Sequence, residues 1–305
     1  MRTAPSRKNF PLRTEAPMAM RRRSAPHKSR FVKIGALIAL PVMVAGIGAL
    51  VMGEALKEER IGADFCYASS APRPNTAFFV DVSFTADTSA AQDRDLTRAL
   101  QESYATLPAN GRLSVFTTAN ANVGSLPVPV LSVCRPPTTA PEQDALGLGS
   151  KPAPYLAHQA QEARAKFDQA VSSLLAAAKD RAQAAKDSPV LEQLQGISRF
   201  RFDGPLKALT VYTDGLQNSD SFQFCQSQGH MPQFAVFAQK PAYRFLKPES
   251  FEGVSVNFLL VEFGALPAPG LPYCTSDEVR GFWPDYFKAN GAKSVQLSRL
   301  RYGAL

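Results

Sequence analysis

Histidine and cysteine are scarce in this chain of 305 residues, which has three of the first and four of the second. The histidines are far apart in the sequence, and no two cysteines have the close spacing of a zinc-binding pair. Zinc sites are built from clustered Cys and His residues. The sequence therefore gives no indication of a structural or catalytic zinc centre.

The signatures of several enzyme classes are also incomplete. Phosphatases of the haloacid-dehalogenase type need a second Asp two residues after the first, where this chain has Ser83. The segment 147–151 (GLGSK) is neither a dinucleotide loop nor a P-loop, and the segment 253–257 (GVSVN) lacks the second Gly of a nucleophile elbow. We therefore predict that the protein is not an enzyme.

The folded part of the chain lacks an excess of positive charge, although the formal net charge is +8. Residues 1–33 hold ten of the 34 Lys and Arg residues and one of the 26 acidic residues, which leaves 24 basic and 25 acidic residues beyond them. A protein that binds a polyphosphate backbone concentrates basic residues on its folded domain. We therefore expect no nucleic-acid partner.

Residues 34–52 contain no charged side chain. As a helix, these nineteen residues would extend about 28 Å, close to the roughly 30 Å hydrocarbon core of a bilayer. The ten cations that precede them predict a cytoplasmic N-terminus and a folded body outside the cytoplasm. We expect a single-pass protein of the inner (cytoplasmic) membrane with a periplasmic body. A cleaved signal peptide is the alternative, which the long basic segment and the long apolar run disfavour.

The predicted organisation has four parts: a basic cytoplasmic tail at 1–33, a transmembrane helix at 34–52, a stalk at 53–75 and a folded domain at 76–305, with an irregular Pro/Gly-rich excursion at 135–154. Within the domain, apolar runs predict strands near 77–82, 113–117, 129–134, 206–213, 254–263 and 295–300, the second and third forming a hairpin. Helical periodicity between them predicts helices around 96–107, 162–178, 189–197, 233–239 and 279–287, with Ser188 capping the third. This alternation predicts an α/β fold with a doubly wound, mostly parallel, Rossmann-like sheet and helices on both faces.

Polar side chains follow two of the predicted strands. Asp81, Ser83 and Thr85 follow the first strand, and their alternation places them on one side if the stretch remains extended. Asp214 follows the fourth strand, and Ser188 opens a helix. Because ligands bind at the carboxyl ends of the strands in such sheets, we expect these residues to converge on one solvent-facing edge. Oxygen ligands alone suit a hard cation, with Mg²⁺ favoured and Mn²⁺ or Ca²⁺ as alternatives.

These residues resemble the metal-ion-dependent adhesion site of the von Willebrand factor A domain. Asp81-x-Ser83-x-Thr85 is similar to the Asp-x-Ser-x-Ser motif of that family, Ser188 stands where the family usually has Thr, and Asp214 in Thr-Asp-Gly matches its last aspartate. The resemblance extends over roughly residues 77–300. It implies that the hydroxyl groups bind the metal directly, that the aspartates act partly through water, and that a carboxylate of a partner protein completes the shell.

The four cysteines all follow the apolar run, which predicts disulfides in an oxidising compartment. Cys66 precedes the first strand and Cys134 ends the reversed strand of the hairpin, so both belong at the starting edge of the sheet. Cys225 and Cys274 follow the fourth and fifth strands and belong at the other edge. We therefore predict the pairs Cys66–Cys134 and Cys225–Cys274.

These expectations favour a membrane-anchored protein-interaction domain, a component or assembly factor of an envelope complex that binds partners with the help of a divalent metal. A metal-dependent hydrolase that uses Asp81 or Asp214 as base is one alternative. A structural subunit with a vestigial metal site is the other. An enzyme site is concave and excludes water, whereas an adhesion site is shallow.

Overall fold

The computed structural model describes residues 62–68, 72–85, 88–118, 126–149, 151–182, 187–225, 230–262, 274 and 276–301. The chain divides into two compact units, Met1–Glu58 and Glu59–Leu305, and every described residue belongs to the second. Among these residues, no helix combines the length and the apolar character needed to cross a bilayer. The expected basic tail and transmembrane helix lie outside the described residues.

Six strands form one sheet in the order β3-β2-β1-β4-β5-β6. Their bounds are Asn75–Val80 (β1), Arg112–Thr117 (β2), Leu131–Cys134 (β3), Leu206–Thr213 (β4), Ser255–Glu262 (β5) and Ser294–Arg301 (β6). All neighbours pair in parallel except β2 and β3, which are antiparallel. The predicted mostly parallel α/β sheet and its hairpin are therefore confirmed.

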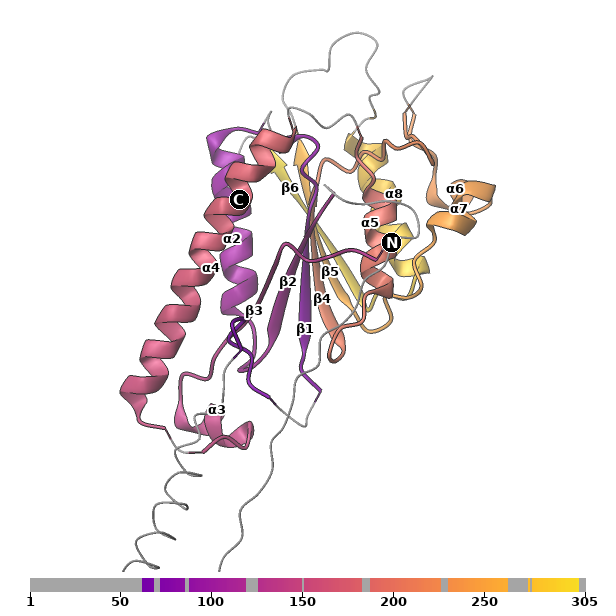
Figure 1. Ribbon diagram of the computed structural model, residues 1–305. Helices are drawn as coiled ribbons and strands as arrows, with labels where there is room; N and C mark the ends of the chain where they lie inside the picture. Colours follow the sequence, from indigo (N-terminus) through magenta and orange to yellow (C-terminus); the bar gives the residue numbers. More distant parts are fainter. Residues whose placement is uncertain are drawn as a thin grey trace, which may run out of the picture. The chain divides into compact units, whose positions relative to one another are not determined.

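Helices cover both faces of the sheet (Figure 1). On one face, α2 (Ala90–Ala105) and α4 (Ala153–Ala182) pack over Phe78 and Val80 of β1. On the other face, α5 (Val190–Arg199), α6 (Phe234–Phe237) and α8 (Ser276–Ala289) share an apolar core with Ala77 and Phe79. Alternate side chains of β1 are thus buried on opposite faces, as a central strand of a doubly wound sheet requires.

The start of α2 follows from its sequence. The Ser89 hydroxyl accepts a hydrogen bond from the Gln92 backbone amide, and the Gln92 side chain accepts one from the Ser89 amide, which completes a capping box. Leu96, Leu100 and Tyr104 then recur on the buried face of the helix. These local signals set the helix directly after the first strand and leave the strand-to-helix connection at the carboxyl edge of the sheet.

Two parts of the secondary structure differ from the prediction. The segment 135–154 is not wholly irregular, because it contains α3 (Ala140–Ala145) and the beginning of α4. Thr139 caps α3 and a proline stands in its first turn, which are helix-start signals that the Pro-rich composition concealed. A further short helix, α7 (Pro241–Leu246), follows α6 and was not predicted.

Two disulfides join the sheet to its flanking segments. Cys66 is bonded to Cys134, and Cys225 to Cys274, which are the two pairs that the strand directions predict. The Cys134 backbone amide also donates to the Asp64 carbonyl at 2.8 Å. Part of the segment expected to be a stalk is therefore fixed to the folded unit.

Candidate functional site

The candidate site lies where three neighbouring parallel strands end. Asp81 follows β1, Thr118 follows β2, and Thr213 is the last residue of β4. Because β1 lies between β2 and β4, the ends of these strands meet at one edge of the sheet. Residues distant in sequence therefore surround the Asp81 side chain.

The Asp81 carboxylate is fully buried and accepts five hydrogen bonds. Its Oδ1 accepts from the backbone amide and hydroxyl of Ser83 at 3.0 and 2.7 Å, and from the Thr118 hydroxyl at 3.3 Å. Its Oδ2 accepts from the Ser188 hydroxyl at 2.8 Å and the Thr213 hydroxyl at 2.9 Å. The expectation of a solvent-facing carboxylate is wrong for Asp81, which instead organises the hydroxyl groups of this edge from beneath.

Ser188 is not the N-cap of the following helix. The N-cap of α5 is Pro189, which provides no side-chain hydrogen bond to the helix. The backbone of Ser188 instead pairs with Asn218, with N–O distances of 2.6 and 2.9 Å in the two directions. This bridge holds Ser188 beside the loop that follows β4 and leaves its hydroxyl free to donate to Asp81.

Thr85 lies apart from the Asp81 cluster. Its buried hydroxyl is within hydrogen-bonding distance of the Val82 carbonyl, at 3.0 Å, and of the Ala178 carbonyl in α4, at 2.9 Å. Strand β1 ends at Val80, and the chain turns at Ser83. The alternation that would place Thr85 beside Ser83 requires an extended chain, so it does not apply here. Thr85 ties the connection after β1 to α4.

The turn after β4 positions the second carboxylate, that of Asp214. Its Oδ1 accepts from the Leu216 backbone amide at 2.9 Å, and the Thr213 hydroxyl accepts from the Gly215 amide at 3.0 Å. Gly215 has a φ of +76°, a conformation in which glycine is favoured. The Trp283 indole donates to the Gly215 carbonyl at 3.1 Å, so α8 supports this turn from below.

A second buried polar cluster holds the loop beyond Asp214. The Glu192 carboxylate, in the first turn of α5, accepts from the Gln217 side chain at 2.8 Å and from the Ser219 hydroxyl at 2.5 Å. Gln217 in turn accepts from the Leu191 backbone amide at 2.8 Å. The loop after β4 and the start of α5, which carry two of the candidate residues, are thereby fixed to each other.

The pKa values of both carboxylates are raised, and the charge of Asp81 contributes to the shift of Asp214. Burial raises the pKa of Asp81 above its usual range, against the hydrogen bonds from Ser83, Ser188 and Thr213, which lower it. Burial and the negative charge of Asp81 raise the pKa of Asp214 to about 8. No Lys or Arg side chain in the described part of the chain pairs with either group. Such a pair favours the uptake of a proton or a cation.

The donor set fits a hard cation in its chemistry. Every side-chain donor at the edge is oxygen, from two carboxylates and several hydroxyl groups, which suits Mg²⁺. The described residues contain no group of three or more His, Cys, Asp or Glu side chains that could hold a metal. Hydroxyl groups and water would therefore supply most of the ligands of an ion held here.

The chain matches no protein-family model, and no curated protein matches it. The geometry of this edge is therefore the basis for assigning a function.

Thr118 and Thr213 belong to the cluster but were not among the expected site residues. Thr213 stands directly before Asp214, and Thr118 follows the second predicted strand. Their positions at the ends of predicted strands indicate possible site residues, but only if β2 and β4 are known to flank β1. The strand order supplies that information.

Proposed function

We propose that this protein is a membrane-anchored component or assembly factor of an envelope complex, and that it binds a partner protein at the Asp81 edge with the help of a divalent cation. The observation that carries the proposal is the convergence of Asp81, Ser83, Ser188 and Asp214 from three separate parts of the chain. A structural role alone does not require a second carboxylate at this strand edge whose pKa is raised by the charge of Asp81.

The resemblance to the von Willebrand factor A domain supports this proposal. Its motif residues are present in order, and they lie on a parallel sheet with one antiparallel strand and helices on both faces. Thr85 departs from the pattern, because its hydroxyl is engaged with backbone carbonyls instead of the cluster. The resemblance is therefore closest at Asp81, Ser83, Ser188 and Asp214.

Ser83, Ser188 and Asp214 are the residues that would hold Mg²⁺, with Asp81 orienting the two hydroxyls from behind. The bound cation would attract a carboxylate of the partner, which is the only chemistry the proposal assigns to it. Ser83 and Asp214 are half-buried, so they remain partly accessible from solvent. Partial exposure of this kind suits contact between proteins, and we assign no catalytic step to the site.

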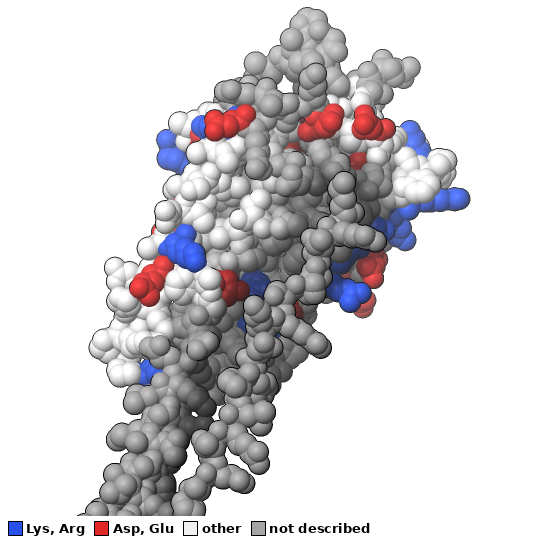
Figure 2. Space-filling view, in the orientation of Figure 1, with Lys and Arg blue, Asp and Glu red and all other residues white. Residues whose placement is uncertain are grey.

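The charge distribution is in keeping with a protein partner. Acidic and basic side chains are interspersed on the face drawn in Figure 2, without a continuous basic field among the residues shown in colour. Nucleic-acid binding depends on such a field. The proposal therefore includes no nucleic acid.

The two disulfides support a location outside the cytoplasm, because such bonds persist in oxidising compartments. Together with the basic tail and the apolar run at 34–52, they favour a single span with the body in the periplasm. A reporter enzyme that works only outside the cytoplasm, fused after Leu305, should be active. Activity of a reporter that works only inside the cytoplasm would contradict this topology.

A pull-down from solubilised membranes tests the proposal. The full chain should retain a partner at about 5 mM Mg²⁺, a concentration chosen because Mg²⁺ sites that keep several waters bind weakly, and release it on addition of chelator. Asp214→Asn should abolish retention, whereas Asp180→Asn, at an exposed position of α4, should not. If retention of the partner is unchanged by the chelator and by Asp214→Asn, a structural subunit with a vestigial site would be favoured.

A further inference from the structure

The sheet face beneath α2 changes character along its length. Towards the carboxyl ends of the strands, this face is apolar and buried, with Val80, Tyr212 and Val261 in the core. Towards the amino ends it carries Thr76, Ala208 and other small or polar residues. A sheet covered on both faces is usually apolar throughout. The polar half is therefore not built to be covered by another apolar element.

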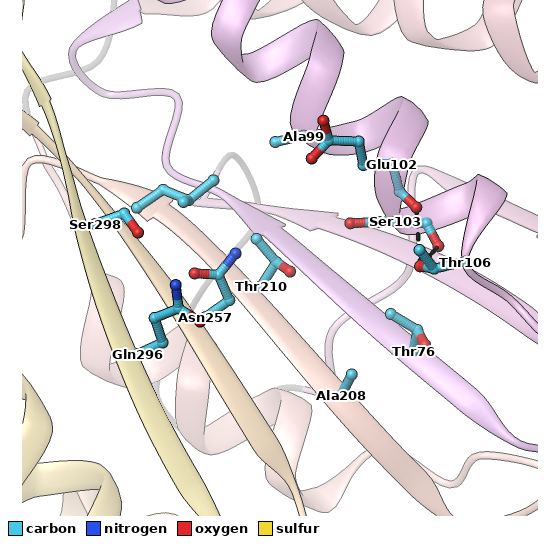
Figure 3. Close-up of a pocket in the computed structure, with 11 residues that line it drawn as sticks. Thr76, Ala99, Glu102, Ser103, Thr106, Ala208, Thr210, Asn257, Gln296 and Ser298 are labelled. Atoms are coloured by element: carbon cyan, nitrogen blue, oxygen red, sulfur yellow. Dashed lines mark hydrogen bonds between the residues drawn. The ribbon is translucent and has the colours of Figure 1, made fainter. Parts of the chain in front are cut away.

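A polar row crosses three neighbouring strands in this half. Thr210 of β4 is in register with Asn257 of β5, which is in register with Gln296 of β6. Figure 3 shows these three side chains side by side on adjacent strands. A hydroxyl and two primary amides thus form a line of groups that both donate and accept hydrogen bonds.

These residues form the floor of a hollow of about 410 Å³. One wall is α2, which contributes Glu102, Ser103 and Thr106 (Figure 3). On the floor, Ser298 of β6 is in register with Leu259 of β5. Sites for small molecules commonly have volumes of about 300–1,000 Å³. The hollow is large enough for a small ligand, and none of the residues of the Asp81 edge lines it.

Two groups in the lining have no side-chain or backbone partner among the described residues. The Oδ1 atom of Asn257 is buried and accepts no hydrogen bond from any residue that the structure describes. Glu102 is exposed on α2, forms no ion pair with another described residue, and is the single charged residue in the lining. A buried acceptor without a donor costs free energy and calls for an explanation. A ligand that donates a hydrogen bond would satisfy the Asn257 oxygen, and one that also carries positive charge would be attracted by Glu102.

We propose that this hollow binds an amino-sugar saccharide. The hydroxyl and amide groups of the floor match the alternating donors and acceptors of sugar hydroxyls, and Glu102 matches a protonated amine by charge. The lining formed by the described residues contains no Lys or Arg, so an acidic sugar would meet only the like charge of Glu102 there. This site is separate from the Asp81 edge, and the inference does not depend on the function proposed there.

Titration calorimetry of the full chain tests the inference, in a detergent whose head group is not a sugar and at pH 6. The probes are a β-1,4-linked glucosamine trimer, the same trimer fully N-acetylated, and spermidine. The glucosamine trimer should bind at one site. Its affinity should fall about tenfold in Asn257→Leu, which loses a hydrogen-bond acceptor, and about threefold in Glu102→Gln, which loses an exposed charge.

Glu249→Gln is the matched control, because Glu249 is also exposed but follows α7 and does not line the hollow. It should leave the affinity unchanged. The N-acetylated trimer should bind about threefold more weakly than the charged trimer, and its affinity should not respond to Glu102→Gln. Spermidine binding as tightly as the trimer would overturn the saccharide assignment. Absence of trimer binding, or equal binding by Asn257→Leu and the unsubstituted protein, would overturn the site itself.

Discussion

Asp81→Ala removes the acceptor on which the carboxyl edge of the sheet depends. Five hydrogen bonds converge on this fully buried side chain, from four residues that lie in four separate parts of the chain. Three of the donors, the hydroxyls of Thr118, Ser188 and Thr213, are themselves buried. After the substitution they would face a cavity instead of a carboxylate.

The expected loss of stability follows from these donors. A buried hydrogen-bonding group left without a partner costs about 1–3 kcal/mol, which gives roughly 3–9 kcal/mol for the three hydroxyls. Rotation of the hydroxyls and entry of water would recover part of this, as would removal of a buried charge whose pKa is raised. We therefore expect Asp81→Ala to lower the free energy of unfolding by about 3–5 kcal/mol.

Urea denaturation of the full chain measures this effect. Trp283 is the single tryptophan, is fully buried, and donates to the carbonyl of Gly215, so its fluorescence reports on the fold close to the site. Asp81→Asn keeps the size and one acceptor oxygen and should cost less than half as much as Asp81→Ala. Asp180→Ala, at an exposed helical position, should change stability by no more than about 0.5 kcal/mol. A loss below about 1 kcal/mol for Asp81→Ala would refute the view that this carboxylate organises the edge.

Three further predictions concern the surroundings of this edge. The pKa of Asp214 is raised from 3.8 to about 8 in the folded protein, so the folded state holds more protons than the unfolded state between these values. The free energy of unfolding should therefore fall as pH rises from 5 to 8. Urea denaturation across this pH range should show a smaller fall in Asp214→Asn, and an equal fall would contradict the assignment. Gly215→Ala should lower the free energy of unfolding by at least about 2 kcal/mol, because the backbone there has a φ of +76° and the new Cβ would lie 2.4 Å from Val279 Cγ1. Thermal unfolding measures this, and an unchanged melting temperature would show that the turn can relax. Replacing both Cys225 and Cys274 with Ser removes a disulfide that closes a loop with a sequence separation of 49. The free energy of unfolding should fall by about 4 kcal/mol by the chain-entropy estimate. A melting temperature equal to that of the unsubstituted protein would indicate a denatured state that remains compact.

Much of the fold could be predicted from the sequence because its strands are strongly apolar. The run around Phe78 and Phe79 is buried on both faces, which identifies a central strand without any knowledge of its neighbours. Short helices were harder to predict. The helix α3 begins with a capping threonine and a proline inside a Pro-rich segment, so its composition favoured a loop over a helix.

The candidate site was predictable only in part, for two physical reasons. Alternation along the chain places Thr85 beside Ser83 only while the backbone stays extended, and β1 ends at Val80. Thr118 contributes to the cluster through the lateral order of the strands, which sequence periodicity does not contain. The hollow beneath α2 depends in the same way on the register between β4, β5 and β6.

Calorimetric titration of the full chain with Mg²⁺ tests the central claim, a cation site at the Asp81 edge, most directly. The account predicts one site for the unsubstituted protein, the same site in the matched control Asp180→Asn, and loss of that site in Asp214→Asn. Replacement of the Ser188 hydroxyl by Ser188→Ala should weaken binding while leaving Asp81 in place. Absence of binding at about 10 mM Mg²⁺, far above the concentrations at which weak extracellular cation sites are filled, or equal binding by Asp214→Asn, would contradict the account.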